Sequence, residues 1–265
     1  QAAHEMANGK LDIAIPVRSQ DEIGQLTSAL NELGIELQKT ENLRRELIAN
    51  VSHELRSPLS VIQGFAETVR DVTWPSEEKR TSQLTMIADE ASRLNKIVND
   101  ILDYSRLQAG VDQISVTDFS VCPILKEIIS RFELETGNRN LSINLNCPDV
   151  EIRFDQNKFI QVLNNLIGNA LNHADSETKS PISAPHKPTN VRIFIKNLGD
   201  VIPTEQLKYI WDRYYRAERV SNNKPMGTGL GLSIVKSILD RHHVRYGASS
   251  ENSETVFWFE TLPLK

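Results

Sequence analysis

The sequence predicts a multidomain protein, with an all-α helical hairpin followed by an α/β two-layer sandwich. Two observations predict this: long stretches with apolar residues every three or four positions come first, and short alternating strands interleaved with helices follow. A length of 265 residues allows one large or two modest domains. The net charge of −5 gives no electrostatic reason to expect a nucleic-acid partner.

The first helical stretch has a heptad pattern, which needs a partner helix. Its apolar residues step by three and four, and they are Ile23, Leu26, Leu30, Leu33 and Leu37. The acidic pair Asp21-Glu22 opens the helix where the helix dipole is positive. The phase changes between Leu37 and Leu43, and the pattern then resumes through Ile48, Val51, Leu55, Ile62 and Val69. This change is equally consistent with an element that transmits rotation and with an ordinary junction.

A second helix follows the turn at Trp74-Pro75-Ser76, with Ser76 as its candidate cap. Its apolar residues also step by three and four, and they are Leu84, Ile87, Ala91, Leu94, Val98 and Ile101. Two such helices joined by a short turn form an antiparallel hairpin. One hairpin cannot cover both of its faces, so we expect a homodimer whose two hairpins make a four-helix bundle.

The pattern changes after Gly110, which predicts a helix stop and a domain boundary near residue 112. Alternation predicts strands around residues 141–145, 191–195 and 256–261, and helical periodicity predicts helices over 123–132, 155–173 and 230–242. The polar, proline-containing segment 175–190 is interpreted as an exposed loop.

Two negative observations concern the membrane and the cysteines. The sequence has no apolar stretch of about 18 residues that could span a bilayer. Cys122 and Cys147 have no metal-ligand spacing, so they are interpreted as packing residues that fit a reducing compartment.

The segment His53-Glu54-Leu55-Arg56-Ser57-Pro58-Leu59 is the first candidate for chemistry. Leu55 and Leu59 belong to the apolar stripe, so His53 should point outward. Pro58 has no N–H for the carbonyl of Glu54 and should bend the helix beside His53. Glu54 can bind one imidazole N–H and make the other ring nitrogen more nucleophilic. An exposed histidine beside an ordinary proline kink remains the alternative.

Two further motifs have the chemistry of a nucleotide site. Asn165, Asn169 and Asn172 share one helical face, and an oxygen-lined face suits Mg²⁺ and phosphate oxygens, although a polar solvent face would look the same. The glycine-rich segment Gly227–Ser233 opens a helix, where bare N–H groups bind anions. It has no Walker lysine and follows a loop, so neither a P-loop nor a Rossmann motif fits, and a plain glycine-rich turn is the alternative.

Taken in this order, these segments resemble the sensor histidine kinase family of two-component systems. His53–Leu59 resembles the phosphoacceptor box, Asn165–Ala170 the asparagine box, Gly227–Val235 the second glycine box, and Ile210–Arg216 the aromatic box before the ATP lid. Asp21-Glu22-Ile23-Gly24, preceded by Ala7–Leu11, resembles the end of a HAMP signal-relay module. The resemblance implies that residues 1–40 end a HAMP module, residues 41–111 form the dimerisation and phosphotransfer hairpin, and residues 112–265 form the histidine kinase-type ATP-binding sandwich.

The resemblance also implies the roles of single residues. His53 would accept the phosphoryl group, with Glu54 as the base, and Ser57 stands where phosphatase-competent members often carry Thr or Asn. Asn165 and Asn169 would face Mg²⁺ and the phosphates of ATP. Other nucleotide contacts would come from Asn172, His173, Asn197, Gly199, Arg213, Arg216, Lys224, Gly227, Gly229 and Gly231.

One stretch departs from the family pattern. The first glycine box usually reads Asp-x-Gly-x-Gly, and here the sequence is Asn197-Leu198-Gly199-Asp200-Val201. Asn197 can still accept a hydrogen bond from the adenine amine, but it carries no charge. Val201 stands in place of the second glycine.

The resemblance implies an ATP- and Mg²⁺-dependent protein histidine kinase that passes its phosphoryl group to an aspartate of a response regulator. It further implies an upstream membrane anchor, so that this part of the protein is cytoplasmic at the cell membrane. Two rival functions stay open at this point. One is an ATPase or chaperone with the same nucleotide fold, and the other is a coiled-coil scaffold with a decayed pocket.

Overall fold

The computed structural model describes residues 14–108, 114–136, 142–147, 150–175, 179–184, 186–187, 190–213, 215 and 229–262. The chain divides into two compact units, residues 1–95 and residues 96–265. The division falls within one long helix, so each unit holds part of it.

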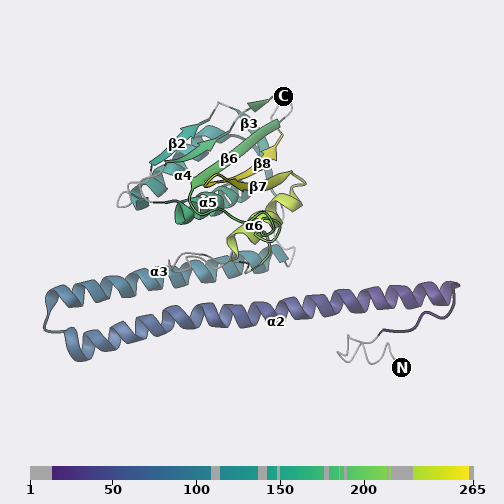
Figure 1. Ribbon diagram of the computed structural model, residues 1–265, viewed down its shortest axis with the longest axis horizontal. Helices are drawn as coiled ribbons and strands as arrows, with labels where there is room; N and C mark the ends of the chain where they lie inside the picture. The colour runs from purple at the N-terminus through teal and green to yellow at the C-terminus, as the bar shows by residue number, and fades with distance from the viewer. Residues whose placement is uncertain are drawn as a thin grey trace. The chain divides into compact units, whose positions relative to one another are not determined.

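Unit 1 is built on the long helix α2 (Glu22–Thr68) (Figure 1). The side chain of Asp21 caps it by accepting hydrogen bonds from the backbone N–H groups of Ile23 and Gly24. The preceding segment folds back along α2, because Asn31 pairs with both the N–H and the carbonyl of Ile15, at 2.8 Å each. Gly24 permits this approach, since a Cβ there would sit 1.8 Å from the carbonyl oxygen of Ser19.

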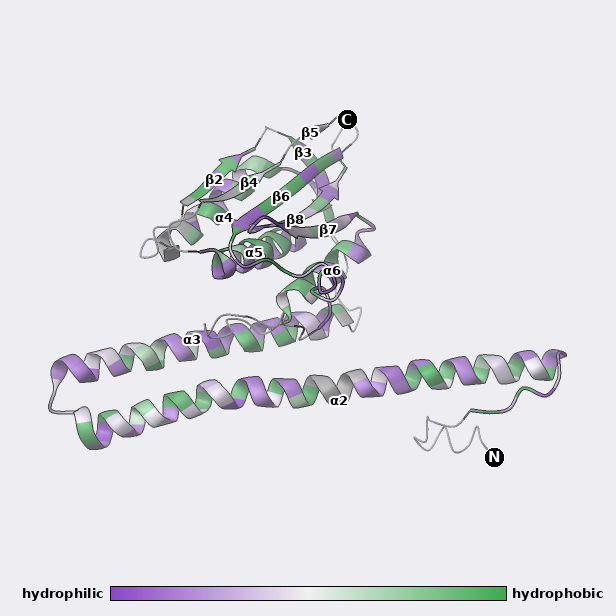
Figure 2. Cartoon of the chain, in the orientation of Figure 1, coloured by the Kyte–Doolittle hydropathy of each residue, from purple (hydrophilic) through white to green (hydrophobic). Residues whose placement is uncertain are grey.

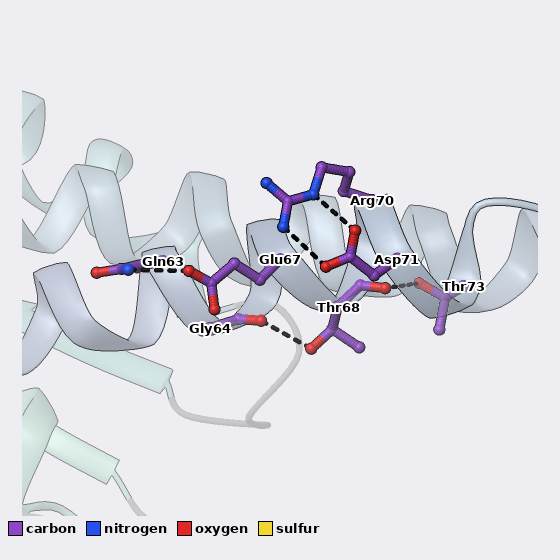
Figure 3. Close-up of polar contacts among 7 residues, drawn as sticks. All are labelled: Gln63, Gly64, Glu67, Thr68, Arg70, Asp71 and Thr73. Atoms are coloured by element: carbon purple, nitrogen blue, oxygen red, sulfur yellow. Dashed lines mark hydrogen bonds and ion pairs between the residues drawn. The ribbon is translucent and has the colours of Figure 1, made fainter.

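The end of α2 changes to the π-helical turn η1 (Val69–Thr73) before the chain reverses. Figure 3 shows the polar contacts of this end: Gln63 donates to Glu67, the Thr68 hydroxyl donates to the Gly64 carbonyl, and Arg70 forms a two-pronged ion pair with Asp71. The Thr73 hydroxyl lies 3.3 Å from the Thr68 carbonyl and also reaches Gln83 on the returning helix. The turn is therefore held by side chains as well as by the backbone.

Helix α3 (Glu77–Gln108) returns from the turn, and its first part runs antiparallel to α2 (Figure 1). The expected hairpin is confirmed. Much of the apolar stripe along α2 and α3 is exposed in the single chain, including Ile23, Leu26, Leu33, Leu37, Ile48, Leu59 and Leu84. Figure 2 shows hydrophobic residues recurring along most of α2.

Unit 2 contains two sheets. The small one pairs β1 (Val116–Ser120) with β3 (Glu151–Asp155) in antiparallel register. The large one has the order β2-β4-β6-β8-β7. Its strands are β2 (Ser142–Asn146), β4 (Lys179–Ser183), β6 (Asn190–Leu198), β8 (Glu254–Thr261) and β7 (Tyr246–Glu251), and β5 (His186–Lys187) pairs with β6 off this path. Strands β2 and β4 are parallel, and the other pairs are antiparallel.

Three helices form the second layer, on one side of the large sheet (Figure 1): α4 (Val121–Thr136), α5 (Gln156–His173) and α6 (Gly231–Arg241). Asp155 caps α5 by accepting from the N–H of Lys158. Aromatic rings fill the space between the layers, with Phe159 of α5 in edge-to-face contact with Phe154 and Phe259. The expected two-layer sandwich is confirmed.

Segment 175–190 corrects one expectation, because it contains strands β4 and β5 instead of only an exposed loop. Ile182 is 1% exposed and Ala184 is fully buried, so this polar segment contributes to the core. Strands β1, β3 and β7 were also not assigned as strands from the sequence. No helix in the described ranges is both long and apolar enough to cross a membrane.

Candidate active site

His53 lies on α2 with its side chain exposed, as the periodicity predicts. Glu54 and Leu55 are half-buried, and Ser57 is exposed. Pro58 is buried, and α2 continues without interruption past it. His53, on unit 1, is therefore accessible to a reactant.

The asparagine motif and the glycine motif meet in unit 2. Asn165, Asn169 and Asn172 are all half-buried on α5, beside fully buried apolar neighbours. The Oδ1 atom of Asn165 lies 3.3 Å from the position that a Cβ would take at Gly231, the first residue of α6. Gly229 has a φ of 69°, a left-handed conformation that favours glycine. Bare backbone at the start of α6 thus faces an amide oxygen of α5.

The other end of α5 meets the end of β6. The carbonyl oxygen of His173 would lie 2.2 Å from a Cβ at Gly199, so only glycine fits there without movement of the backbone. The N–H of Asp175 donates to the Leu198 carbonyl at 2.8 Å, which fastens the two segments. The His173 side chain is exposed, so the part of His173 that touches Asn197 and Gly199 is its carbonyl. From Asn165 to His173 the helix rises about 12 Å.

Asn197 is buried between these segments, at 2% exposure. Its Nδ2 atom donates to the His173 carbonyl at 3.4 Å. A carbonyl only accepts, so the amide nitrogen must face it and Oδ1 must point elsewhere. Oδ1 is buried and has no hydrogen-bond partner among the described residues. A buried acceptor without a partner is costly, and a ligand amine would satisfy it.

One hydroxyl group beside Asn197 and a second one on the next strand were not predicted from the sequence. Thr255 pairs with Asn197 across β6 and β8, and Ser250 pairs with Thr255 across β7 and β8. The N–H of Ile202 donates to Ser250 Oγ at 2.9 Å, and Ser250 Oγ lies 2.8 Å from Thr255 Oγ1. These contacts hold the backbone after Gly199. Thr255 is in phase with buried Phe257 and Phe259, so strand alternation could have placed it inside.

The expected aromatic box is anchored to the sheet. Ile210 is buried, and Trp211 makes edge-to-face contacts with Tyr246 and Phe257, at 5.0 and 5.9 Å between centroids. The guanidinium of Arg213 lies 4.9 Å from the ring centroid of Tyr104. The pKa of Tyr104 is raised because the residue is buried, and the positive charge of Arg213 opposes this shift. Arg213 was expected at a phosphate, and the structure gives it an aromatic partner. Arg216, Lys224 and Gly227 lie outside the described residues.

The donor set fits Mg²⁺ held through oxygen atoms. No group of three His, Cys, Asp or Glu side chains that could hold a metal occurs in the described ranges. Asn165 and Asn169 each offer an amide oxygen, and Mg²⁺ usually combines one or two protein oxygens with phosphate oxygens and water.

Comparisons with known proteins agree with this geometry. Residues 154–265 match the family described as histidine kinase-, DNA gyrase B- and HSP90-like ATPase, which defines the class of the sandwich. Residues 43–110 match the His Kinase A phosphoacceptor domain, and residues 1–39 match the HAMP domain. With all three domains in this order, the chain belongs to the sensor histidine kinases of two-component systems.

Single relatives support the family assignment. The chain is 33% identical over 232 residues to the sensor protein kinase WalK of Staphylococcus aureus strain MRSA252, which covers 86% of this chain and 38% of that protein. The chain therefore spans well under half of that relative.

Two solved structures are also similar. One is histidine kinase ThkA in complex with response regulator protein TrrA, with a TM-score of 0.67, 26% identity and coverage of 86% of this chain and 64% of that one. Histidine kinase AdeS of Acinetobacter baumannii shares the fold, with a TM-score of 0.64, 22% identity and coverage of 80% and 98%.

Proposed function

We propose that this chain is the kinase portion of a sensor histidine kinase that phosphorylates its own His53 from ATP and passes the phosphoryl group to an aspartate of a response regulator. The observation that carries the proposal is the contact between the two nucleotide motifs, where Asn165 Oδ1 faces Gly231 at the start of α6. An asparagine helix and a bare helix N-terminus then bind the same triphosphate.

The nucleotide would lie along α5. Asn197 Oδ1 accepts a hydrogen bond from the adenine amine, which satisfies the buried acceptor. Gly199 keeps the backbone beside the base free of a Cβ, and Asn172 and His173 lie next to the ribose or phosphates. Asn165 and Asn169 hold Mg²⁺, which offsets the phosphate charge. Gly227, Gly229 and Gly231 let the backbone approach the phosphates. Arg216 and Lys224 are lid cations that can neutralise them, and Arg213 can do so once it leaves the Tyr104 ring.

The transfer step depends on positioning and electrostatics. A ring nitrogen of His53 attacks the γ-phosphorus in line with the leaving ADP oxygen, and Glu54 holds the other ring nitrogen. His53 is exposed, so a separate catalytic unit can reach it. The phosphohistidine P–N bond then supplies the phosphoryl group to the aspartate. Ser57 keeps a hydroxyl near the phosphohistidine, where it can orient water for phosphatase activity.

The assembly follows from the exposed stripe and the relatives. Two copies would cover the apolar stripe of α2 and α3 as a four-helix bundle, and the regulator would dock on the hairpin near His53. A complex of a similar kinase with a response regulator supports this partner class. We assign residues 1–40 to the HAMP module, 41–111 to the hairpin and 112–265 to the sandwich. The HAMP match supports an upstream membrane anchor, with this portion cytoplasmic.

The test is incubation of the purified chain with γ-labelled ATP and Mg²⁺. Acid-labile, alkali-stable label should appear on the wild type and vanish in His53→Gln, while ATP binding stays unchanged. His243→Asn is the matched control, because it removes an exposed histidine from a left-handed position that asparagine tolerates. Label at another residue would refute the role of His53, and ATP binding without labelling would favour a scaffold or ATPase.

A further inference from the structure

We propose that Cys122 and Cys147 form a redox-active dithiol, which closes to an intramolecular disulfide when a peroxide oxidises it. They are the two cysteines of the 265-residue chain. They lie 25 residues apart in sequence, yet the Sγ atom of Cys122 donates a hydrogen bond to the backbone carbonyl of Cys147 at 3.5 Å. Both are thiols and both are half-exposed. The fold therefore brings together residues whose sequence context suggested only packing.

This hydrogen bond limits how far apart the two cysteines can lie. Ordinary bond lengths put the Cα of a residue within roughly 2.8 Å of its own carbonyl oxygen, so Sγ of Cys122 lies within about 6 Å of the Cα of Cys147. A disulfide holds its two Cβ atoms roughly 3.5–4.5 Å apart, so closure requires the Cys147 side chain to turn toward the Sγ atom of Cys122.

Backbone hydrogen bonds fix both segments that carry the thiols. Cys122 is the second residue of α4, and the preceding Val121 N–H donates to the Val150 carbonyl at 3.0 Å. Cys147 follows β2, whose last residue, Asn146, accepts from the N–H of Ala184 at 3.0 Å. The two cysteines are therefore held close together, and their partial exposure lets a small oxidant reach them.

The oxidation balances with hydrogen peroxide as the oxidant. One thiolate attacks a peroxide oxygen, the O–O bond breaks, and a sulfenic acid and hydroxide form. The second thiolate attacks that sulfur, the S–S bond forms, and a second hydroxide leaves. The two protons released by the thiols convert the two hydroxides to water. The net reaction takes two thiols and one peroxide to one disulfide and two waters.

The bond would tie the start of α4 to the end of an edge strand. Helix α4 lies under the asparagine helix, since the Phe132 ring is 3.8 Å from the position of a Cβ at Gly168, between Asn165 and Asn169. A closed loop of 25 residues restricts the unfolded chain and should raise the melting temperature of the sandwich by about 5–10 °C. Oxidation would thus stiffen the layer beneath the candidate nucleotide site.

The test treats the reduced full chain with stoichiometric hydrogen peroxide, without nucleotide, and then labels the remaining thiols with a maleimide under denaturing conditions. Both thiols should disappear together, with the loss of two hydrogen atoms from the intact mass, a peptide linking residues 122 and 147, and reversal by dithiothreitol. The melting temperature should rise in the oxidised wild type and stay unchanged in Cys122→Ser and Cys147→Ser after the same treatment.

Three outcomes would overturn the proposal. They are no loss of thiols, independent oxidation of each sulfur to sulfinic acid, and links only between chains, seen as concentration-dependent dimers on a non-reducing gel. Cys147→Ser serves as the matched control, because its remaining thiol should gain oxygen instead of losing hydrogen. No step of this test depends on ATP, so its result is separate from that of the proposed kinase activity.

Discussion

The hairpin and the sandwich bury their apolar residues very differently. On the hairpin, Ile48 is 57% exposed, and Leu33 earlier on α2 is 56% exposed, although both lie in the heptad pattern. In the sandwich, Phe159 and Phe259 are fully buried between the layers. The sandwich thus completes its own core, whereas the hairpin presents a surface that another helix pair can cover. The phosphoacceptor candidate His53 lies in the hairpin, and the candidate nucleotide motifs lie in the sandwich.

The largest effect that would test this contrast is on association. Leu33→Asn should weaken the dimer by about 4 kcal/mol, because two copies each lose roughly 2 kcal/mol of apolar burial, on the order of a 1000-fold rise in Kd. Analytical ultracentrifugation would measure it. Ile35→Asn is the control: Ile35 is 65% exposed but lies off the seam, so its dimer should persist. An unchanged Kd for Leu33→Asn would show that this seam is not the dimer surface.

A pair of glycine substitutions should act in opposite directions in the two regions. Gly199→Ala forces a Cβ against the His173 carbonyl and should destabilise the sandwich by about 3 kcal/mol and abolish ATP binding. Gly64→Ala meets nothing within 4 Å inside α2 and should stabilise the hairpin by about 0.5–1 kcal/mol. Urea unfolding and nucleotide titration measure both. If Gly199→Ala bound ATP normally, Gly199 would not be part of the nucleotide site.

A smaller effect is expected at the hairpin turn. Thr73 is buried, and its hydroxyl reaches the Thr68 carbonyl (Figure 3). The same hydroxyl also reaches the Gln83 side chain. Thr73→Val should lose about 1 kcal/mol of hairpin stability, because Gln83 is left without that donor. Thr85→Val removes only an exposed bond to the Thr81 carbonyl and should change almost nothing. Equal thermal unfolding of the two variants would contradict a specific role of Thr73 in the turn.

The smallest expected effect is on how the stability of the sandwich depends on pH. His242 stacks on Phe154 at 3.7 Å, and burial lowers its pKa. The nearby Asp155 opposes this shift, and the charges of Arg241, His243 and Lys158 add to it. Below pH 6.5 the unfolded chain gains a proton that the folded chain resists, so stability falls as the pH decreases. His242→Phe keeps the stacking and should flatten this decline in urea titrations at several pH values. An equally steep decline would assign the acid sensitivity to another group.

Local periodicity by itself determined much of the architecture. The heptads predicted the hairpin, and the alternation in residues 191–195 and 256–261 predicted β6 and β8, because side-chain direction repeats every 3.6 or 2 residues without any distant contact. The same periodicity predicted that His53 points outward. The order of the motifs was sufficient to indicate the family, since each motif is a short, continuous piece of chain.

Tertiary structure alone decided which distant residues meet. Strand β4 (Lys179–Ser183) has a mostly polar sequence without apolar alternation, and its place between β2 and β6 depends on sheet pairing. The approach of the His173 carbonyl to Asn197 and Gly199, and of Cys122 to Cys147, likewise requires the layers to close. Sequence patterns record which side of an element faces inward. The partner it meets there is set by packing between elements far apart in the chain.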